Sequence, residues 1–357
     1  MRDLRELFAA FDALAAEGET GVLASVVYVE GSAYRRAGAR ALLLPDDEVV
    51  GVISGGCLEG DLLERARGVR ASGEALRVRY DQRGEDDLVW GLGLGCAGLI
   101  DVLLQPVTRQ EPGPLPRLRE LSGGAEPGVL ATVIAREGEV APPLGALVEL
   151  GAGERSELFA LGTARTRWRE GQGFRVELLE EIIAPPVPLL VFGAGPDAAP
   201  VVRLAAALGF AVRVFDPRPA LARGDRFPEA LEVAACPPEE APARALVTPE
   251  SVVLVMTHHY LHDKALLGWL LRTPARYLGV LGPKRRTEDL LRDLRGEGLA
   301  VSDEALERVH GPAGLDLGAD GPAEIALALL AEIQAVLAGR PGGPLRDRKG
   351  PIHDPTP

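Results

Sequence analysis

A glycine-rich turn between a predicted strand and a predicted helix constrains this chain more than any other feature. The apolar run VPLLVFG (187–193) is typical of a buried strand, and GAGPDA (193–198) follows it and opens a helical pattern. Gly193 permits a tight turn, and Gly195 lets a phosphate approach the backbone amides at the helix N-terminus. Strand, turn and helix in this order predict a Rossmann-like domain over residues 187–340.

The rest of the C-terminal half alternates short apolar runs with helical patterns, which predicts βαβ units and a parallel sheet. Ligands of such sheets bind beyond the carboxyl ends of the strands. Asp216 ends the second predicted strand, about 20 residues after the glycine turn, where a carboxylate could accept hydrogen bonds from ribose hydroxyls. His258 follows another strand, and Lys284, Arg285 and Arg286 follow a third. These cations favour an anion such as phosphate, although a solvated basic turn explains them equally well.

The N-terminal half has the pattern of an α+β domain. Apolar residues at helical spacing predict a helix over 3–16, and Val-rich or alternating runs predict strands. The expected elements that follow are a strand over 21–31, a hairpin with its turn at 45–47, a helix that starts after residue 57 and ends near Gly68 or Gly73, and strands at 75–81 and 99–106. Because aromatic residues make up only 4% of the chain, we expect an aliphatic core.

A weak internal repeat lies in this half. Residues 128–146 align without gaps on residues 21–39, and nine of the nineteen positions are identical. A duplicated β-hairpin explains the matching Glu-Gly and Gly-Ala pairs, and two unrelated hairpins with similar turn residues are the alternative. The first copy has Ser32 and Arg35 where the second has Glu139 and Pro142, so we expect any chemistry in the first copy.

Composition predicts where the domains begin and end. Residues 106–127 are rich in Pro, Gly and charge, with little periodicity beyond one possible short helix, and a proline-rich joint stands at 184–188. The predicted organisation is an N-terminal domain at 1–105, a linker at 106–127, a β-rich extension that packs with the N-terminal domain at 128–184, the Rossmann-like domain at 187–340 and a tail at 341–357.

Two glycine-rich loops carry cysteines. In ISGGCLEG, Gly55 and Gly56 let the chain approach a ligand, and Cys57 precedes a predicted helix, whose N-terminus stabilises a thiolate. In GLGLGCAGL, Cys96 lies among glycines whose amides could hold a phosphate or a pterin. A small buried cysteine and a plain inter-strand turn are the respective alternatives. Cys236 is interpreted as structural.

Charge and cysteine content exclude several classes of protein. The net charge is −13, from 39 basic and 52 acidic residues, which argues against nucleic-acid binding. The start of the chain is charged and amphipathic rather than a secretory signal, and no apolar run reaches the length of a membrane span. The three cysteines are too far apart for a disulfide framework or a zinc ribbon. A cytoplasmic protein with free thiols is the expectation.

Several of these motifs together resemble the xanthine dehydrogenase accessory family, XdhC/CoxI, along nearly the whole chain. The matching segments, in order, are EGSAYRRAGAR (30–40), GVISGGCLE (51–59), GLGLGCAGL (91–99), VFGAGPDA (191–198), MTHHYLHD (256–263), YLGVLGPKRR (277–286) and GPAGLDLGADGPAEIALALLAEI (311–333). The resemblance implies an N-terminal XdhC/CoxI domain and a C-terminal Rossmann-like domain.

The resemblance also implies a function. Family members bind molybdenum cofactor, a pterin with a dithiolene-bound metal and a phosphate or a dinucleotide. They protect it while a cysteine desulfurase helps to exchange an oxo ligand for sulfur, and they deliver it to an apo molybdenum hydroxylase such as xanthine dehydrogenase. A carrier rather than an enzyme, and a homodimer, are therefore expected.

The resemblance and the motifs together imply which residues would bind the cofactor. A thiolate suits a soft metal, so Cys57 or Cys96 would contact the molybdenum. The expected cofactor-binding residues are Ser32, Arg35, Gly55, Gly56, Cys57, Cys96, Gly193, Gly195, Asp216, His258, Lys284 and Arg285.

The chain departs from the family pattern at three places. Tyr34 stands where the family usually has proline, and His259-Tyr260 stand where it usually has Asp-His. The third change is in a turn that usually reads Gly-Ser-Arg-Arg and here reads Gly282-Pro283-Lys284-Arg285, which keeps the positive charge. The second change removes an acidic group and puts any role of that group in doubt.

An NAD(P)-dependent oxidoreductase is the main alternative. It would use the same glycine turn, with Asp216 favouring NAD and the neighbouring Arg218 leaving NADP open. His258 could serve as its proton donor. A third interpretation is an interaction scaffold whose Rossmann site binds nothing.

Overall fold

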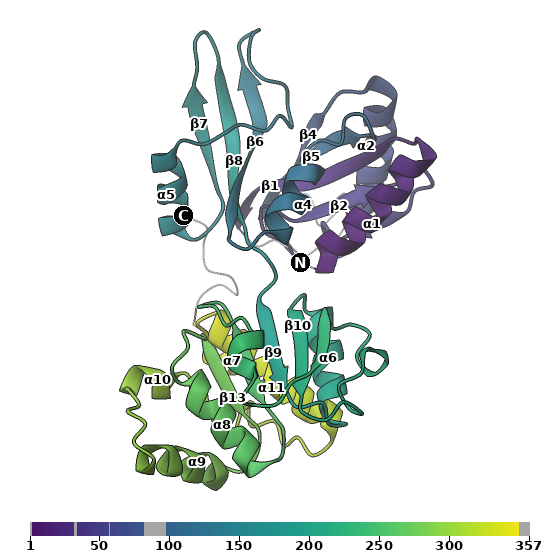
Figure 1. Ribbon diagram of the computed structural model, residues 1–357. Helices are drawn as coiled ribbons and strands as arrows, with labels where there is room; N and C mark the ends of the chain where they lie inside the picture. The colour runs from purple at the N-terminus through teal and green to yellow at the C-terminus, as the bar shows by residue number, and fades with distance from the viewer. Residues whose placement is uncertain (1, 32–33, 57, 82–97, 350–357) are drawn as a thin grey trace. The chain divides into compact units, whose positions relative to one another are not determined.

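The computed structural model describes residues 2–31, 34–56, 58–81 and 98–349 (Figure 1). The chain forms two compact units, and the boundary between them falls between Pro185 and Pro186. This boundary lies within the proline-rich joint at 184–188. Among the described residues, no helix combines the length and apolar character needed to cross a membrane.

The C-terminal unit is built on a six-stranded parallel sheet in the order β11-β10-β9-β12-β13-β14. Its elements are β9 (Pro188–Phe192), α6 (Ala198–Ala207), β10 (Ala211–Asp216), β11 (Glu232–Ala235), α7 (Ala241–Arg244), β12 (Val252–Val255), α8 (Tyr260–Leu270), β13 (Tyr277–Val280), α9 (Lys284–Gly296), α10 (Asp303–Glu307), β14 (Val309–His310) and α11 (Pro322–Leu337). The predicted parallel sheet and Rossmann-like fold are confirmed.

Both faces of this sheet are buried, as the apolar strands require. Alternate residues of β9 point to opposite faces, so Leu189 packs with helices α6 and α11 while Leu190 packs with α7, α8, α9 and α10. The strand order reverses between β9 and β12, which are adjacent in the sheet. This reversal creates the crevice in which open α/β sheets bind their ligands.

The N-terminal unit is an α+β structure with two antiparallel sheets, β3-β2-β1-β5-β4 and β6-β8-β7. Its elements are α1 (Arg2–Glu17), β1 (Gly21–Gly31), β2 (Arg40–Leu43), β3 (Val49–Gly51), α2 (Glu59–Ser72), β4 (Leu76–Asp81), β5 (Gly98–Val107), α4 (Leu115–Gly123), β6 (Gly128–Glu137), α5 (Ala152–Leu161), β7 (Arg165–Glu170) and β8 (Arg175–Ile183). The hairpin turn expected at 45–47 joins β2 to β3, and α2 ends at Gly73 in the left-handed conformation.

The segment predicted as a linker, 106–127, is packed into this unit. Strand β5 continues to Val107, and helix α4 presents Leu115, Leu118 and Leu121 to a buried cluster that also contains Leu7 of α1. Three leucines at a spacing of three residues form one helix face, and their burial holds the segment in place despite its Pro- and Gly-rich composition.

Candidate functional site

The glycine turn of the C-terminal unit, residues 193–197, lies at the reversal of the strand order. Gly193 has φ +125°, and a Cβ atom there would lie 2.3 Å from the carbonyl oxygen of Met256. Its amide donates to the carbonyl of Phe215 at 2.8 Å. Glycine is therefore required at position 193 because the loops after β9 and β12 approach each other closely.

Asp216, expected to accept hydrogen bonds from a ribose, instead fixes this turn from within the protein. Its side chain is fully buried, and Oδ2 accepts the amide of Ala194 at 2.7 Å. The guanidinium of Arg218 pairs with both carboxylate oxygens, each at 2.8 Å. Burial raises the pKa of Asp216. The hydrogen bonds from the Arg218 side chain and from the backbone amides of Ala194 and Arg218 outweigh burial and hold that pKa below its usual range. A role in ribose binding stays a prediction that would need Arg218 to move.

Asp197 and His258 form a pair that the sequence reasoning missed. Nε2 of His258 lies 2.7 Å from Oδ2 of Asp197, which joins the loops after β9 and β12 across the crevice. His258 has φ +59°, uncommon for a residue with a side chain, and its side chain is 59% exposed. A Cβ at Gly195 would lie 2.7 Å from Oδ1 of Asp197, so the second glycine makes room for a carboxylate of the protein itself. The sequence feature that could have indicated this pair is the acidic residue of GAGPDA, Asp197.

The basic residues after β13 divide into two groups. Lys284 and Arg285 begin α9 and are exposed, as an anion-binding role requires. Arg286 instead pairs with the buried Asp263 of α8 at 2.6 Å, and its guanidinium lies over the ring of Tyr260. Arg286 therefore joins two helices, and only Lys284 and Arg285 keep the expected role as a prediction.

In the N-terminal unit, Ser54 and Glu59 close the loop on either side of position 57. The buried Ser54 hydroxyl accepts the amides of Gly56 at 3.3 Å and Leu58 at 3.0 Å. Glu59 accepts the amides of Ser54 at 3.0 Å and Leu58 at 3.1 Å. The Ser54 hydroxyl also donates to Oε2 of Glu59. Burial raises the pKa of Glu59, but the hydrogen bond from the Ser54 hydroxyl and those from the backbone amides bring it below its ordinary value. Sequence reasoning singled out the glycines and the cysteine here but not the two polar residues that hold the loop.

The first two family motifs of the N-terminal unit lie beside each other. A Cβ at Gly55 would lie 3.8 Å from the ring of Tyr34, which is 60% exposed. Gly56 has φ +105° and open space where a side chain would be, so its backbone is accessible to a ligand. Arg35 follows Tyr34 and is partly buried. Three predicted site residues, Ser32, Cys57 and Cys96, lie outside the described residues.

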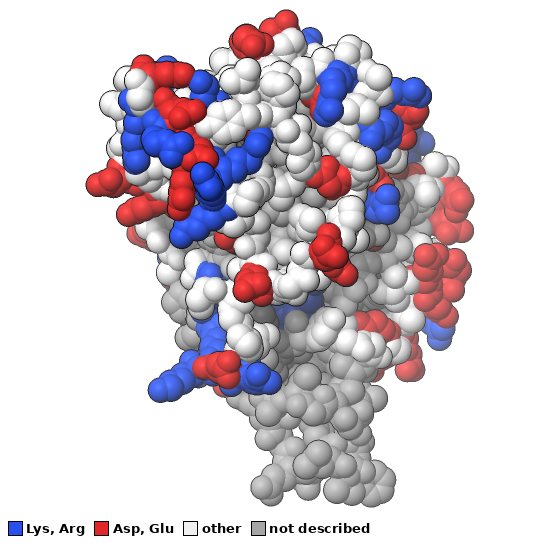
Figure 2. All heavy atoms as spheres, turned by 90° about the horizontal axis from the view of Figure 1, so that it is seen from below, with Lys and Arg blue, Asp and Glu red and all other residues white. Residues whose placement is uncertain are grey.

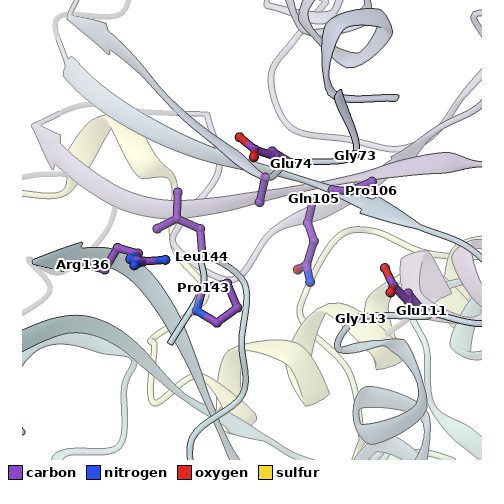
Figure 3. A pocket seen from close by; sticks show the side chains of 10 residues that line it. Gly73, Glu74, Gln105, Pro106, Glu111, Gly113, Arg136, Pro143 and Leu144 are labelled. Atoms are coloured by element: carbon purple, nitrogen blue, oxygen red, sulfur yellow. The ribbon is translucent and has the colours of Figure 1, made fainter. Parts of the chain in front are cut away.

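A pocket of about 490 Å³ opens elsewhere in the N-terminal unit (Figure 3). Its lining includes Gln105, whose side chain extends into the space between Leu144 and Gly113. Of the predicted site residues that the structure describes, none lines it. On the described part of the face in Figure 2, Lys and Arg side chains lie among Asp and Glu side chains, without the continuous basic patch that nucleic acids need.

The fold and the glycine turn define a protein with an α+β N-terminal unit and a Rossmann-type C-terminal unit. Residues 14–81 match the model of the XdhC and CoxI family, and residues 189–333 match that of the XdhC Rossmann domain. The chain belongs to the XdhC and CoxI family.

Individual relatives agree with this assignment over most of their length. The chain is 34% identical over 325 residues to a probable xanthine dehydrogenase subunit of Bacillus subtilis (strain 168), covering 90% of this chain and 94% of that protein. It is 27% identical over 320 residues to the molybdenum cofactor insertion chaperone PaoD of Escherichia coli (strain K12), covering 89% and 84%. The crystal structure of a protein described as a xanthine dehydrogenase from Bacillus halodurans superposes with a TM-score of 0.76 at 32% identity, covering 95% and 97%.

Proposed function

We propose that this protein carries molybdenum cofactor and serves the maturation of a molybdenum hydroxylase of the xanthine dehydrogenase type. The near-full-length similarity to a molybdenum cofactor insertion chaperone and to a xanthine dehydrogenase subunit supports the proposal. One geometric observation supports a particular binding site for the cofactor. The turn with Tyr34 and Arg35 lies against Gly55, in the loop that contains Cys57.

The residues of this loop fit such a cargo. The amides on both sides of position 57 are held by Ser54 and Glu59, and the space beside Gly56 is open. A thiolate at Cys57 is a suitable ligand for a soft metal, and exposed backbone next to it lets a planar group approach. Arg35 supplies a guanidinium that can pair with a phosphate in bidentate geometry. Cys96 remains the second candidate thiol.

The finer features of the role belong to the same proposal. The protein would shield the cofactor during sulfuration by a cysteine desulfurase and hand it to the apo-hydroxylase, in the cytoplasm and as a homodimer. The cofactor would be the monophosphate or the dinucleotide form. Besides Arg35, the exposed Lys284 and Arg285 at the start of α9 stay candidates for binding a phosphate.

An NAD(P)-dependent oxidoreductase is the second candidate, and the Asp197–His258 pair favours it. An imidazole held by a carboxylate at the sheet's crevice can transfer a proton. Two observations weigh against it: both oxygens of Asp216 are already hydrogen bonded, and the Asp197 carboxylate stands in the turn where a pyrophosphate would bind. We therefore rank the oxidoreductase below the carrier.

The deciding experiment is a measurement of pterin content. The protein is purified from cells that make molybdenum cofactor, oxidised, and assayed for fluorescent pterin per chain. Cys57→Ala and Cys96→Ala are compared with Cys236→Ala, a matched control because Cys236 is 3% exposed and burial raises the pKa of its thiol. The proposal expects pterin in the wild type and the control, and its loss in one of the other two variants. Absence of pterin in the wild type, even after cofactor is added in vitro, would favour the oxidoreductase and lead to NADH titration.

A further inference from the structure

The repeat of the N-terminal unit extends well beyond the hairpin that the sequence indicates. In the first copy the amide of Gly38 donates to Val26 at 2.8 Å, and in the second the amide of Gly145 donates to Val133 at 2.8 Å. The register of β1 on β5 shifts between Val26 and Tyr28, and that of β6 on β8 shifts at the equivalent place, after Val133.

The remaining elements follow in the same order in both copies. Helix α2 and strands β4 and β5 in the first copy correspond to α5, β7 and β8 in the second. Both helices end at a glycine in the left-handed conformation, Gly73 with φ 73° and Gly162 with φ 71°. The unit thus contains two copies of one antiparallel repeat.

The two copies pack against each other through equivalent residues. One buried cluster contains Val27 and Ile134, which occupy the two register shifts, together with Leu103 of β5 and Leu179 of β8. Each copy therefore contributes the same two positions to a shared core, as two subunits do across a two-fold axis.

This arrangement lets each copy contact the turn of the other. Glu181 of β8 and Gln105 of β5 occupy the same register position in the two copies. A Cβ at Gly38 would lie 2.4 Å from Oε1 of Glu181, and a Cβ at Gly145 would lie 2.5 Å from Cδ of Gln105. The second copy thus contacts the turn of the first copy, which contains Arg35 and Gly38 and is called the first turn below. The first copy contacts the turn of the second copy, which contains Gly145.

The two contacts differ in charge. Arg40, opposite Ser25 in β1, donates from Nη1 to the carbonyl of Gly38 at 2.8 Å and to Glu181 at 3.2 Å, and its Nη2 donates to the second carboxylate oxygen. Both side chains of this pair are 5% exposed. The residue of the second copy that corresponds to Arg40 is Leu147, which lies opposite Thr132 and is 41% exposed.

In the second copy the turn is held by a weaker contact. Gln105 donates to the carbonyl of Gly145 at 3.4 Å, beside the pocket of Figure 3. A buried ion pair adds little net stability compared with apolar residues of similar size, but it fixes one geometry. We therefore expect the buried ion pair to hold the turn of the first copy more firmly than Gln105 holds the turn of the second copy.

We propose that Glu181 is a positioning residue for the first turn. Through Arg40 and Gly38, its carboxylate holds the turn in the conformation that places Tyr34 against Gly55 and presents Arg35 to the cargo. The assignment to cargo binding rests on the proposed function, whereas the restraint of the turn does not. Glu181 lies outside residues 14–81, which match the XdhC and CoxI family model.

The test gives the turn of the first copy the uncharged contact that holds the turn of the second copy. Glu181→Ala alone would leave a buried guanidinium without its partner and could unfold the unit. Arg40→Leu combined with Glu181→Gln removes both charges and installs the residues found at the two equivalent positions, Leu147 and Gln105. We expect its melting temperature to stay within about 5 °C of the wild type, since such replacements are often neutral.

Trypsin cleavage after Arg35 and Arg36, followed by mass spectrometry, measures how firmly the turn is held. In the double variant we expect cleavage to be about tenfold faster than in the wild type, because a locally opened segment is cut in proportion to its open population. Gln105→Ala, the matched change at the contact with the turn of the second copy, should leave this rate unchanged. Equal cleavage rates in the double variant and the wild type would overturn the proposal.

Pterin binding is measured separately on the same proteins. A double variant that is folded, faster to cleave and about tenfold weaker in cofactor affinity supports the link from Glu181 to the cargo. Faster cleavage with unchanged cofactor affinity would overturn that link. If the wild type itself binds no pterin, the proposed function fails, and the cleavage rates still decide whether Glu181 holds the turn.

Discussion

The imidazole of His258 and the carboxylate of Asp197 meet across the crevice of the parallel sheet, with Nε2 and Oδ2 2.7 Å apart. Asp197 belongs to the turn that opens α6, and His258 follows β12. A turn of this type ordinarily offers its amides to a phosphate. Here it already contains a carboxylate, so the charge of the crevice differs from that of a nucleotide-binding domain.

Removal of the Asp197 charge should improve the binding of phosphorylated ligands at the glycine turn. Two negative charges about 4 Å apart repel by about 1 kcal/mol in water and by about 4 kcal/mol at an effective dielectric constant of 20. We expect Asp197→Asn to bind NADH about tenfold more tightly than the wild type in a fluorescence titration. His258→Asn, which keeps the carboxylate, should show no such gain. Tight, stoichiometric NADH binding by the wild type would contradict this prediction.

The Asp216–Arg218 pair should make the C-terminal unit sensitive to acid. Asp216→Asn should lower the free energy of unfolding at pH 7 by about 2–3 kcal/mol, because Asp216 accepts charged and backbone hydrogen bonds while buried. The pKa of Asp216 is lowered in the folded state. The stabilisation is therefore complete above the unfolded pKa of about 3.9 and is lost as pH falls through the folded pKa.

Urea unfolding at pH 7, 4 and 3 measures this effect. The difference between the wild type and Asp216→Asn should shrink at the lowest pH. Asp225→Asn is the matched control, because Asp225 and Arg223 form a pair in which both side chains are 60% exposed, and it should leave the free energy of unfolding nearly unchanged. A constant difference across the pH range would refute the assignment.

Gly193 should tolerate no side chain. Gly193→Ala would bring a Cβ atom within 2.3 Å of the Met256 carbonyl oxygen at φ +125°, so we expect a loss of at least about 2–3 kcal/mol. Gly296→Ala, at the end of α9 where nothing lies within 4 Å of the new atom, should be neutral or slightly stabilising. Comparable melting temperatures for the two variants would show that the β9 and β12 loops can separate at little cost.

Ser54 should stabilise the loop around position 57. Ser54→Ala removes a buried acceptor from the amides of Gly56 and Leu58, and we expect it to lower the free energy of unfolding by about 1–2 kcal/mol and to reduce pterin retention. Ser72→Ala, at the end of the same helix that this loop precedes, is the control and should leave pterin retention unchanged. Equal retention in the two variants would remove Ser54 from the proposed cofactor site.

The predictable parts of the fold are those that hydrophobic periodicity encodes. The runs that form β9, β10, β12 and β13 are buried on both faces, so their apolar character predicts a parallel sheet directly. Helix α4 falls in a segment whose Pro- and Gly-rich composition predicts a linker, and its leucines give only the periodicity of one possible short helix, which does not indicate that the segment is packed. Similarly, the sequence reveals the repeat only where identity persists, since its later strands keep their hydrogen-bond register without keeping their residues.

The candidate site was harder to predict for a different reason. Motif spacing places Asp216 correctly at the end of β10, but whether its carboxylate faces a ligand or Arg218 depends on side-chain geometry. Asp197, Ser54 and Glu59 were missed because their roles arise from contacts with atoms that the sequence does not show to be near. The expected roles of Ser32, Cys57 and Cys96 stay predictions, because these residues lie outside the described part of the chain.

The shared core of the two repeats has a consequence for how this unit can be shortened or divided. A polypeptide that ended at Val107 would leave Val27 and Leu103 without Ile134 and Leu179, which complete their cluster. Such a half could bury this surface only against a second molecule of itself, which would bear two identical turns with Arg35. Joined in one chain, the two halves can diverge independently, so one turn is held by a buried ion pair while its twin is held by an uncharged side chain.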